Sequence, residues 1–109
     1  MSSATSMVYY SKQTDNDLDE ILAGLLTWQK HTLTREFCLN YVSDIIDICE
    51  GLAYKSFHAD AVYEIHKRYG KKVHKYSRNK NTTWYIIYNV TASNDIFIEK
   101  IISNYLTVN

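Results

Sequence analysis

The chain has 109 residues, 46 % of them hydrophobic, and a formal net charge of zero at pH 7. This length suits one small domain over residues 1–109 with a single core, in which residues 1–6 form a polar, disordered tail. No apolar run approaches the roughly 20 residues that span a bilayer, and the N-terminal MSSATSMVYY lacks the basic and apolar regions of a signal peptide. We therefore expect a cytoplasmic protein with no membrane segment.

The overall neutrality conceals an uneven distribution of charge. Residues 1–54 carry three basic and eight acidic side chains, whereas residues 55–80 carry eight basic and two acidic ones. Residues 81–109 have a net charge of −1. The middle of the chain is therefore basic in its own right, which favours contact with an anionic partner.

Cysteine and histidine spacing gives no sign of a metal site. Cys38 and Cys49 lie roughly 16 Å apart on one expected helix, too far for a disulfide, and we expect two buried thiols. The sequence has no CxxC or HxxxH pattern, and His58, His66 and His74 are spaced by eight residues, which does not bring imidazoles together on a helix. We predict neither a metal nor a cofactor.

A strand and an amphipathic helix are expected first. Residues 7–12 (MVYYSK) form a β-branched and aromatic run typical of a strand. Residues 14–17 (TDND) follow with N-cap residues and acids, and these acids are expected to be solvated and to complement the helix dipole rather than to hold a metal. The helix should end near His31. Its apolar stripe repeats at the helical period and comprises Leu18, Ile21, Leu22, Leu25, Leu26 and Trp28.

A second helix is expected after Thr34, the predicted N-cap, with Gly51 close to its end. The two helices would form a hairpin joined by a short polar turn. Residues 58–68 add a helical turn or two, closed by Gly70.

Beyond Gly70 the hydrophobic period changes to two. Strands are predicted over residues 73–78, 83–90 and 96–103, with a turn at residues 79–82. The order of elements predicts an α+β domain in which the two-helix hairpin packs against a small antiparallel β-sheet. In the middle strand, one face carries Trp84, Ile86, Tyr88 and Val90, and the other carries Tyr85, Ile87 and Asn89.

The run YGKKVHKYSRNKNTTWYIIYNV interleaves cationic and aromatic side chains over two of these strands. Such a surface suits a phosphate backbone with bases stacked on the rings, or an acidic protein partner. The alternative is a solvated hairpin whose lysines keep an edge strand soluble.

Several of these segments, in this order, resemble the RelE/ParE superfamily of toxins from bacterial type II toxin–antitoxin modules. The resemblance extends from about Tyr9 to Tyr105. Its pieces are YYSKQTDNDLDEIL, FCLNYVSDIIDICEGLA, and VHKYSRN followed by WYIIYNV and IFIEKIIS.

The resemblance implies a growth-arresting protein that a cognate antitoxin protein wraps and neutralises. One branch of the superfamily cleaves mRNA in the ribosomal A site with lysines, arginines and a tyrosine or histidine on the sheet. Another branch lacks those groups and poisons DNA gyrase. A ribosome-dependent endoribonuclease, a non-catalytic binder and an inactive relative that only binds its antitoxin all stay open.

The candidate site departs from the cleaving branch in two places. Tyr85 stands where that branch commonly has an arginine, and Tyr105 corresponds roughly to the basic residue expected after the last strand.

The basic strand itself is retained. His74, Tyr76 and Arg78 project to one face and form the candidate catalytic set, in which Arg78 stabilises phosphate charge and the other two move protons. The alternative is that His74 and Tyr76 pack while Arg78 caps a turn. The residues expected to bind RNA or the antitoxin are Lys71, Lys72, Lys75, Lys80, Tyr85 and Tyr105.

Overall fold

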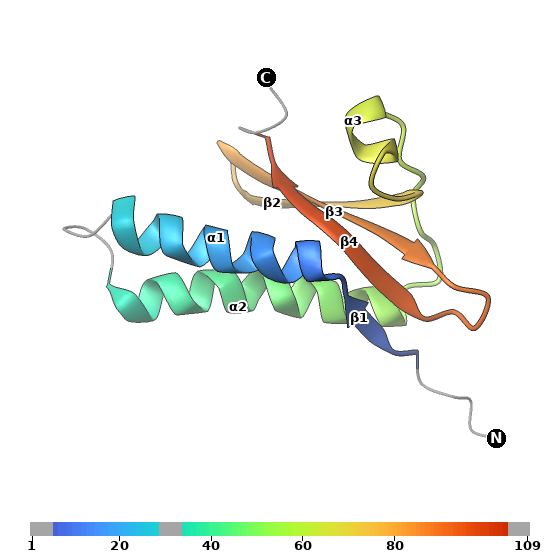
Figure 1. Ribbon diagram of the computed structural model, residues 1–109, viewed down its shortest axis with the longest axis horizontal. Helices are drawn as coiled ribbons and strands as arrows, with labels where there is room; N and C mark the ends of the chain where they lie inside the picture. Colours follow the sequence, from blue (N-terminus) through green and yellow to red (C-terminus); the bar gives the residue numbers. More distant parts are fainter. Residues whose placement is uncertain (1–5, 29–33, 105–109) are drawn as a thin grey trace.

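The computed structural model describes residues 6–28 and 34–104. The chain folds as an α+β domain, with a helical hairpin on one side of a four-stranded sheet and a short helix on the other side (Figure 1). In chain order the elements are β1 (Val8–Tyr10), α1 (Lys12–Trp28), α2 (Arg35–Gly51), the 3-10 turn η1 (Leu52–Tyr54), α3 (Glu64–Lys67), β2 (Lys72–Asn79), β3 (Thr82–Val90) and β4 (Ile96–Ser103).

The sheet has the strand order β1-β4-β3-β2. β2, β3 and β4 are antiparallel to their neighbours, as predicted, but β1 pairs parallel with β4, with Val8 opposite Ile96. The sheet is therefore mixed, and the prediction of an antiparallel sheet is wrong for β1. Hydrophobic period identifies a strand, but it carries no information on the direction in which distant strands pair.

Both long helices begin at side-chain caps. The Thr34 hydroxyl accepts a hydrogen bond from the backbone N–H of Phe37 at 3.0 Å, which confirms the predicted cap of α2. α1 starts one turn earlier than predicted, because Ser11 Oγ accepts from the N–H of Thr14 at 3.0 Å. The expected end of this helix near His31 lies outside the described residues.

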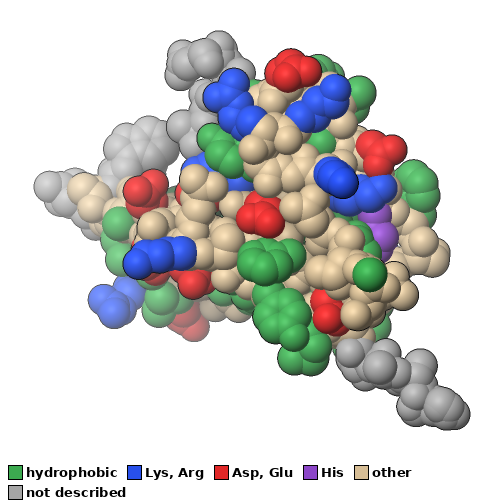
Figure 2. Space-filling model, turned by 45° about the vertical axis from the view of Figure 1, so that its right-hand side comes forward, with side chains coloured by type: hydrophobic (Ala, Val, Ile, Leu, Met, Phe, Trp, Pro, Cys, Tyr) green, Lys and Arg blue, Asp and Glu red, His purple; other side chains and the backbone are tan. Residues whose placement is uncertain are grey.

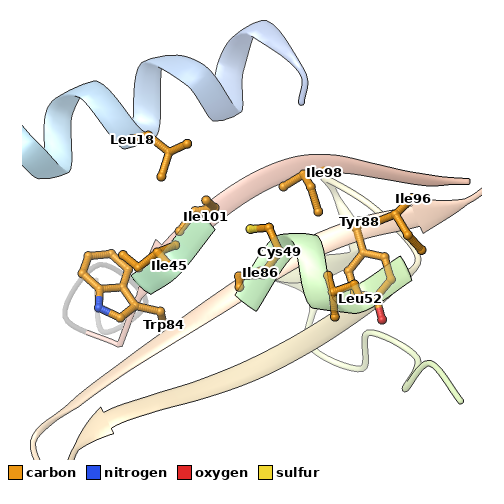
Figure 3. Packing of buried hydrophobic residues seen from close by; sticks show 10 residues of the cluster. All are labelled: Leu18, Ile45, Cys49, Leu52, Trp84, Ile86, Tyr88, Ile96, Ile98 and Ile101. Atoms are coloured by element: carbon orange, nitrogen blue, oxygen red, sulfur yellow. The ribbon is translucent and has the colours of Figure 1, made fainter. Parts of the chain in front are cut away.

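The core lies between the hairpin and one face of the sheet. Figure 3 shows Ile45 of α2 beside Trp84, and Cys49 beside Ile86. Both cysteines are buried and unpaired, as predicted, and burial raises the pKa of the Cys49 thiol to about 12. The cluster of buried residues comprises Leu18, Ile45, Cys49, Leu52, Trp84, Ile86, Tyr88, Ile96, Ile98 and Ile101.

α1 also completes the hydrogen bonding of β4 beyond the point where β1 ends. Thr14 Oγ1 donates to the Ile98 carbonyl at 2.9 Å, and Asp17 Oδ2 accepts from the Ile101 N–H at 3.1 Å. The other Asp17 oxygen accepts from Lys100 Nζ at 2.8 Å. Asp17 is buried, so the prediction that it is a solvated dipole-complementing acid is wrong. It acts as an edge partner for the sheet.

The opposite face of the sheet is covered in part by the segment that contains α3 (Figure 1). The predicted helical turns in residues 58–68 are confirmed only over α3. Gly70 follows, where an added Cβ would lie 3.0 Å from Ile87 Cγ2 and 3.1 Å from the Tyr88 carbonyl oxygen. A glycine at this position lets the backbone lie close against β3 before β2 begins.

Candidate functional site

β2 is an edge strand, and its outer edge is only partly covered. The Val73 N–H donates to the Ala59 carbonyl at 3.0 Å, and the Ala61 N–H donates to the Lys71 carbonyl at 2.8 Å. No other residue of the described part of the chain pairs with this edge beyond Val73. The backbone N–H and C=O groups of successive residues point to opposite edges of a strand. Lys75 and Ser77 therefore point these groups outward, as Val73 does.

A cavity of about 350 Å³ opens where the preceding segment separates from β2. Three parts of the chain surround it, namely residues 55–66, the start of β2, and β3. Its lining is mainly aromatic and apolar, with two lysines. The lining residues are Lys55, Phe57, Ala59, Val62, Tyr63, His66, Val73, His74, Lys75, Tyr85 and Tyr88.

Aromatic rings form much of the wall. The His66 and Tyr85 rings lie 4.7 Å apart between centroids with an interplanar angle of 38°, and Tyr63 meets His66 edge-on at 5.6 Å. Phe57 and Tyr63 are 73 % and 67 % exposed. The cavity therefore combines the buried ring of His66 and the half-buried ring of Tyr85 with two solvent-facing rings, an arrangement on which a flat ligand stacks well.

His66 carries an unpaired polar atom at this wall. The residue is only 3 % exposed, and its Nδ1 has no hydrogen-bond partner among residues 6–28 and 34–104. Burial lowers the pKa of His66 below its ordinary value, so the ring is neutral at pH 7. A buried imidazole with an unpaired nitrogen is uncommon in folded proteins, and it marks this wall as a place for a polar ligand group.

The charged groups at the cavity are positive. Lys55 and Lys75 have no carboxylate within ion-pair distance in the described part of the chain, whereas Lys72 pairs with Asp60 at 2.5 Å. Lys71 and Lys80 are exposed and likewise form no ion pair with a described residue. Figure 2 shows Lys and Arg side chains over the upper part of the molecule, the side on which α3 lies in Figure 1.

His74 lines this cavity in a neutral form. Burial and then the positive charge of Lys55 lower the pKa of its imidazole below the ordinary value of about 6.5. A neutral imidazole accepts a proton at pH 7, which is the property required of a general base.

The structure places Tyr76 and Arg78 on the same face as His74, as predicted, because His74 pairs with Ile86 and Tyr76 pairs with Trp84. That face is the one toward the helices. One Arg78 Nη donates to Asp44 at 2.7 Å and to the Tyr76 hydroxyl at 3.2 Å.

The guanidinium of Arg78 also lies 4.0 Å above the Tyr41 ring centroid. Its pKa is raised, because the hydrogen bonds with Asp44 and Tyr76 outweigh the opposing effect of burial. The Arg78 side chain is thus held against α2, and it does not cap the β2–β3 turn. No hydrogen bond or ion pair joins it, or Tyr76, to His74 among the described residues.

The predicted binding residues are divided between the two faces of the sheet. Lys75 and Tyr85 lie opposite each other in the β2–β3 register and share the face that α3 partly covers. Lys72 and Arg78 lie on the helical face. Tyr105 lies outside the described residues.

Sequence reasoning missed the contribution of residues 55–66. Tyr63 and His66 come from residues 58–68, for which only a helical turn or two was predicted, and no element was predicted at Lys55 and Phe57. The available signal was the pair of aromatic runs, YKSF and VYEIH, in which the large apolar residues do not follow a single helical face.

No helix within residues 6–28 and 34–104 has the length and hydropathy to cross a bilayer. The same residues contain no group of three or more His, Cys, Asp or Glu side chains placed to hold a metal ion. Comparisons of the chain with known protein families, curated proteins and solved structures found no match.

Proposed function

We propose that this chain is a cytoplasmic, growth-arresting toxin of a type II toxin–antitoxin module, with a RelE/ParE-like fold, and that it acts on translated mRNA. The observation that carries the proposal is the cavity beside β2, which is lined by Lys55 and Lys75, two cations without an ion-pair partner among the described residues, and by His74, whose pKa is lowered. The order of a strand, a helical hairpin and three further strands supports the same superfamily.

The groups at this cavity suit metal-independent RNA cleavage. His74 takes the proton of the 2′-hydroxyl, the 2′-oxygen bonds to phosphorus, and the bond from phosphorus to the 5′-oxygen breaks. Tyr85, which lines the same cavity from the other face of the sheet, gives a proton from its hydroxyl to the leaving oxygen. Lys55 and Lys75 stabilise the charge that develops on the phosphoryl oxygens. The product is a 2′,3′-cyclic phosphate.

The antitoxin partner belongs to the same proposal. An acidic segment of that protein would lie across Lys75 and the outer edge of β2, where outward backbone groups are available for pairing. It would cover the cavity and so exclude RNA.

Expression of the chain alone should arrest bacterial growth, and co-expression of the neighbouring reading frame should restore growth. Primer extension after induction should then map new 5′ ends within translated codons, and these ends should disappear in His74→Gln. Normal growth at high soluble expression would count against the toxin assignment.

A second function is favoured by one contact. Arg78 is held by Asp44 and Tyr76, so the one arginine of the predicted catalytic set already has its charge neutralised within the fold. This observation favours a non-catalytic toxin that binds a macromolecule such as DNA gyrase, or an inactive relative that binds only its antitoxin. Arrested growth with intact transcripts would support the binder, and soluble expression without arrest would support the inactive relative.

A further inference from the structure

We propose that the cavity beside β2 holds one unstacked nucleobase of a single-stranded RNA, with an adjacent phosphate on Lys55 and Lys75. The inference rests on the proposed action on RNA and adds a base-binding subsite to it. The subsite is defined by Phe57, Tyr63, His66, Tyr85 and the two lysines.

The shape and lining of the cavity suit a flat aromatic ligand. Its volume of about 350 Å³ falls in the range of small-molecule sites, which begins at about 300 Å³. The tilted rings of His66 and Tyr85 form its floor, and the exposed rings of Phe57 and Tyr63 stand at its rim. Single-stranded nucleic acids bind proteins by this kind of stacking, because every base offers a π-face.

The buried nitrogen of His66 adds a polar requirement to the ligand. A neutral imidazole has one donor and one acceptor nitrogen, and the Nδ1 of His66, a cavity-lining residue that is 3 % exposed, has no hydrogen-bond partner among the described residues. Nucleobase edges carry both donors and acceptors. A nucleobase edge can offer the kind of partner that this nitrogen lacks, which a purely apolar side chain cannot.

The charge at the rim selects an anionic strand. Lys55 and Lys75 are not neutralised by any described carboxylate, so a phosphate next to the bound base meets two cations. RNA brings the flat ring and the phosphate together in one repeating unit. An acidic protein segment also carries negative charge, but it stacks on the rings of the cavity only where one of its aromatic residues lies opposite them.

The binding experiment uses four short fluorescent homopolymers of 2′-O-methyl RNA, which resist cleavage at the 2′ position, and an abasic strand of the same length. Tyr63→Ala and Phe57→Ala remove rings at the rim. Tyr54→Ala is the matched control, because Tyr54 is a similarly exposed aromatic residue, at 80 % exposure, that ends η1 just before this segment and does not line the cavity. Fluorescence anisotropy gives the affinities.

We expect each rim variant to weaken binding of at least one homopolymer by about 5- to 100-fold, which is the usual effect of losing one stacking contact. The abasic strand should bind the wild type and the variants alike, and Tyr54→Ala should match the wild type. Lys75→Ala should lower the slope of log affinity against log salt by about 0.7. Lys12→Ala, which changes an exposed lysine at the start of α1 and outside the cavity, should leave base preference unchanged.

The outcomes separate the subsite from the function. RNA that binds the wild type and the rim variants equally would overturn the base subsite and leave RNA as the target. If no RNA binds, both the subsite and the action on mRNA are wrong. If RNA does not bind, and if Tyr63→Ala abolishes antitoxin binding while Tyr54→Ala retains it, the cavity receives a side chain of the antitoxin instead.

Discussion

Arg78 connects β2 to the helical hairpin through two contacts with α2, and it makes a third contact within β2. It donates to Asp44 of α2 and to Tyr76, and it stacks on the Tyr41 ring. Its side chain is 18 % exposed and that of Asp44 is 49 % exposed, so solvent screens part of the attraction. Arg78 therefore has a structural role in joining β2 to α2, although it does not cap a turn as the structural alternative predicted.

Replacing Arg78 and Asp44 one at a time distinguishes a structural role of Arg78 from a catalytic role. We expect Arg78→Ala and Asp44→Ala each to lower the free energy of unfolding by about 1 kcal/mol, since the pair is partly exposed. Urea denaturation measures this. If Arg78 also stabilises phosphate charge, Arg78→Ala abolishes growth arrest through a loss of about 10²–10³ in rate, whereas Asp44→Ala retains it. Equal arrest in both variants would remove Arg78 from the reaction.

Three histidines give stability a defined dependence on pH. The pKa values of His58, His66 and His74 are all lowered in the folded state, first by burial. The unfolded chain therefore binds more protons than the folded chain below about pH 6.5, and stability is lost as the pH falls through this range. The Asp60 carboxyl has its pKa lowered by the hydrogen bond with Lys72, so it responds only at more acidic pH.

We expect the midpoint temperature of thermal unfolding to decrease as the pH is lowered from about 7.5 to about 5. In His74→Gln this temperature should decrease less steeply over the same interval. Cleavage should follow the same direction, because protonated His74 no longer accepts a proton. A midpoint that is constant over this interval would contradict the lowered pKa values. Calorimetry at several pH values and single-turnover rates provide the two readouts.

At the scale of elements, α1 replaces a strand at the edge of β4. β1 pairs with β4 only from Ile96 to Ile98, and Thr14 and Asp17 supply hydrogen-bonding groups to the backbone from there on. A helix side chain thus satisfies a backbone N–H that would otherwise be buried without a partner. This contact fixes the position of α1 along the sheet.

Removing the Asp17 carboxylate should therefore be costly. Asp17→Ala leaves the Ile101 N–H and Lys100 without this partner, and we expect the free energy of unfolding to fall by about 2–3 kcal/mol. Asp19→Ala is the matched control, because Asp19 is an exposed acid on the same helix, and it should change stability by under about 0.5 kcal/mol. Similar losses in both variants, measured by urea denaturation, would show that the edge contact contributes little.

At the scale of the whole molecule, the uneven charge of the sequence becomes a difference between the helical hairpin and the part of the molecule built by α3 and β2. The acidic first half of the chain builds α1 and α2, whereas the basic residues 55–80 build α3, β2 and the cavity. Opposite charges on separate sides steer an anionic partner to one of them. The overall neutrality of the chain does not reveal this polarity.

Association with the proposed antitoxin should accordingly weaken as salt rises, because the cationic part of the surface is screened. We expect Lys75→Glu to slow association and raise the dissociation constant by about tenfold or more. Lys12→Glu, an exposed change at the start of α1, should have a much smaller effect. Surface plasmon resonance at several salt concentrations distinguishes the cases. A complex that is indifferent to salt and to both changes would place the partner on the helices.

The sequence by itself determined the elements and their faces. The apolar periods identified both long helices and three of the strands closely, Thr34 was the N-cap as predicted, and the alternation in β3 separated the core face of Ile86 from the face of Tyr85. These features depend on neighbouring residues along the chain, so local spacing is sufficient to predict them.

Only the tertiary structure decided which distant groups meet. The parallel pairing of β1 with β4, the burial of Asp17 at the sheet edge, and the pairing of Arg78 with Asp44 each join residues more than 30 positions apart. The cavity likewise requires residues 55–66 to separate from β2 at one point along its edge. Such contacts follow from how the layers pack and from which polar groups remain unpaired, and a local pattern of residues does not encode either.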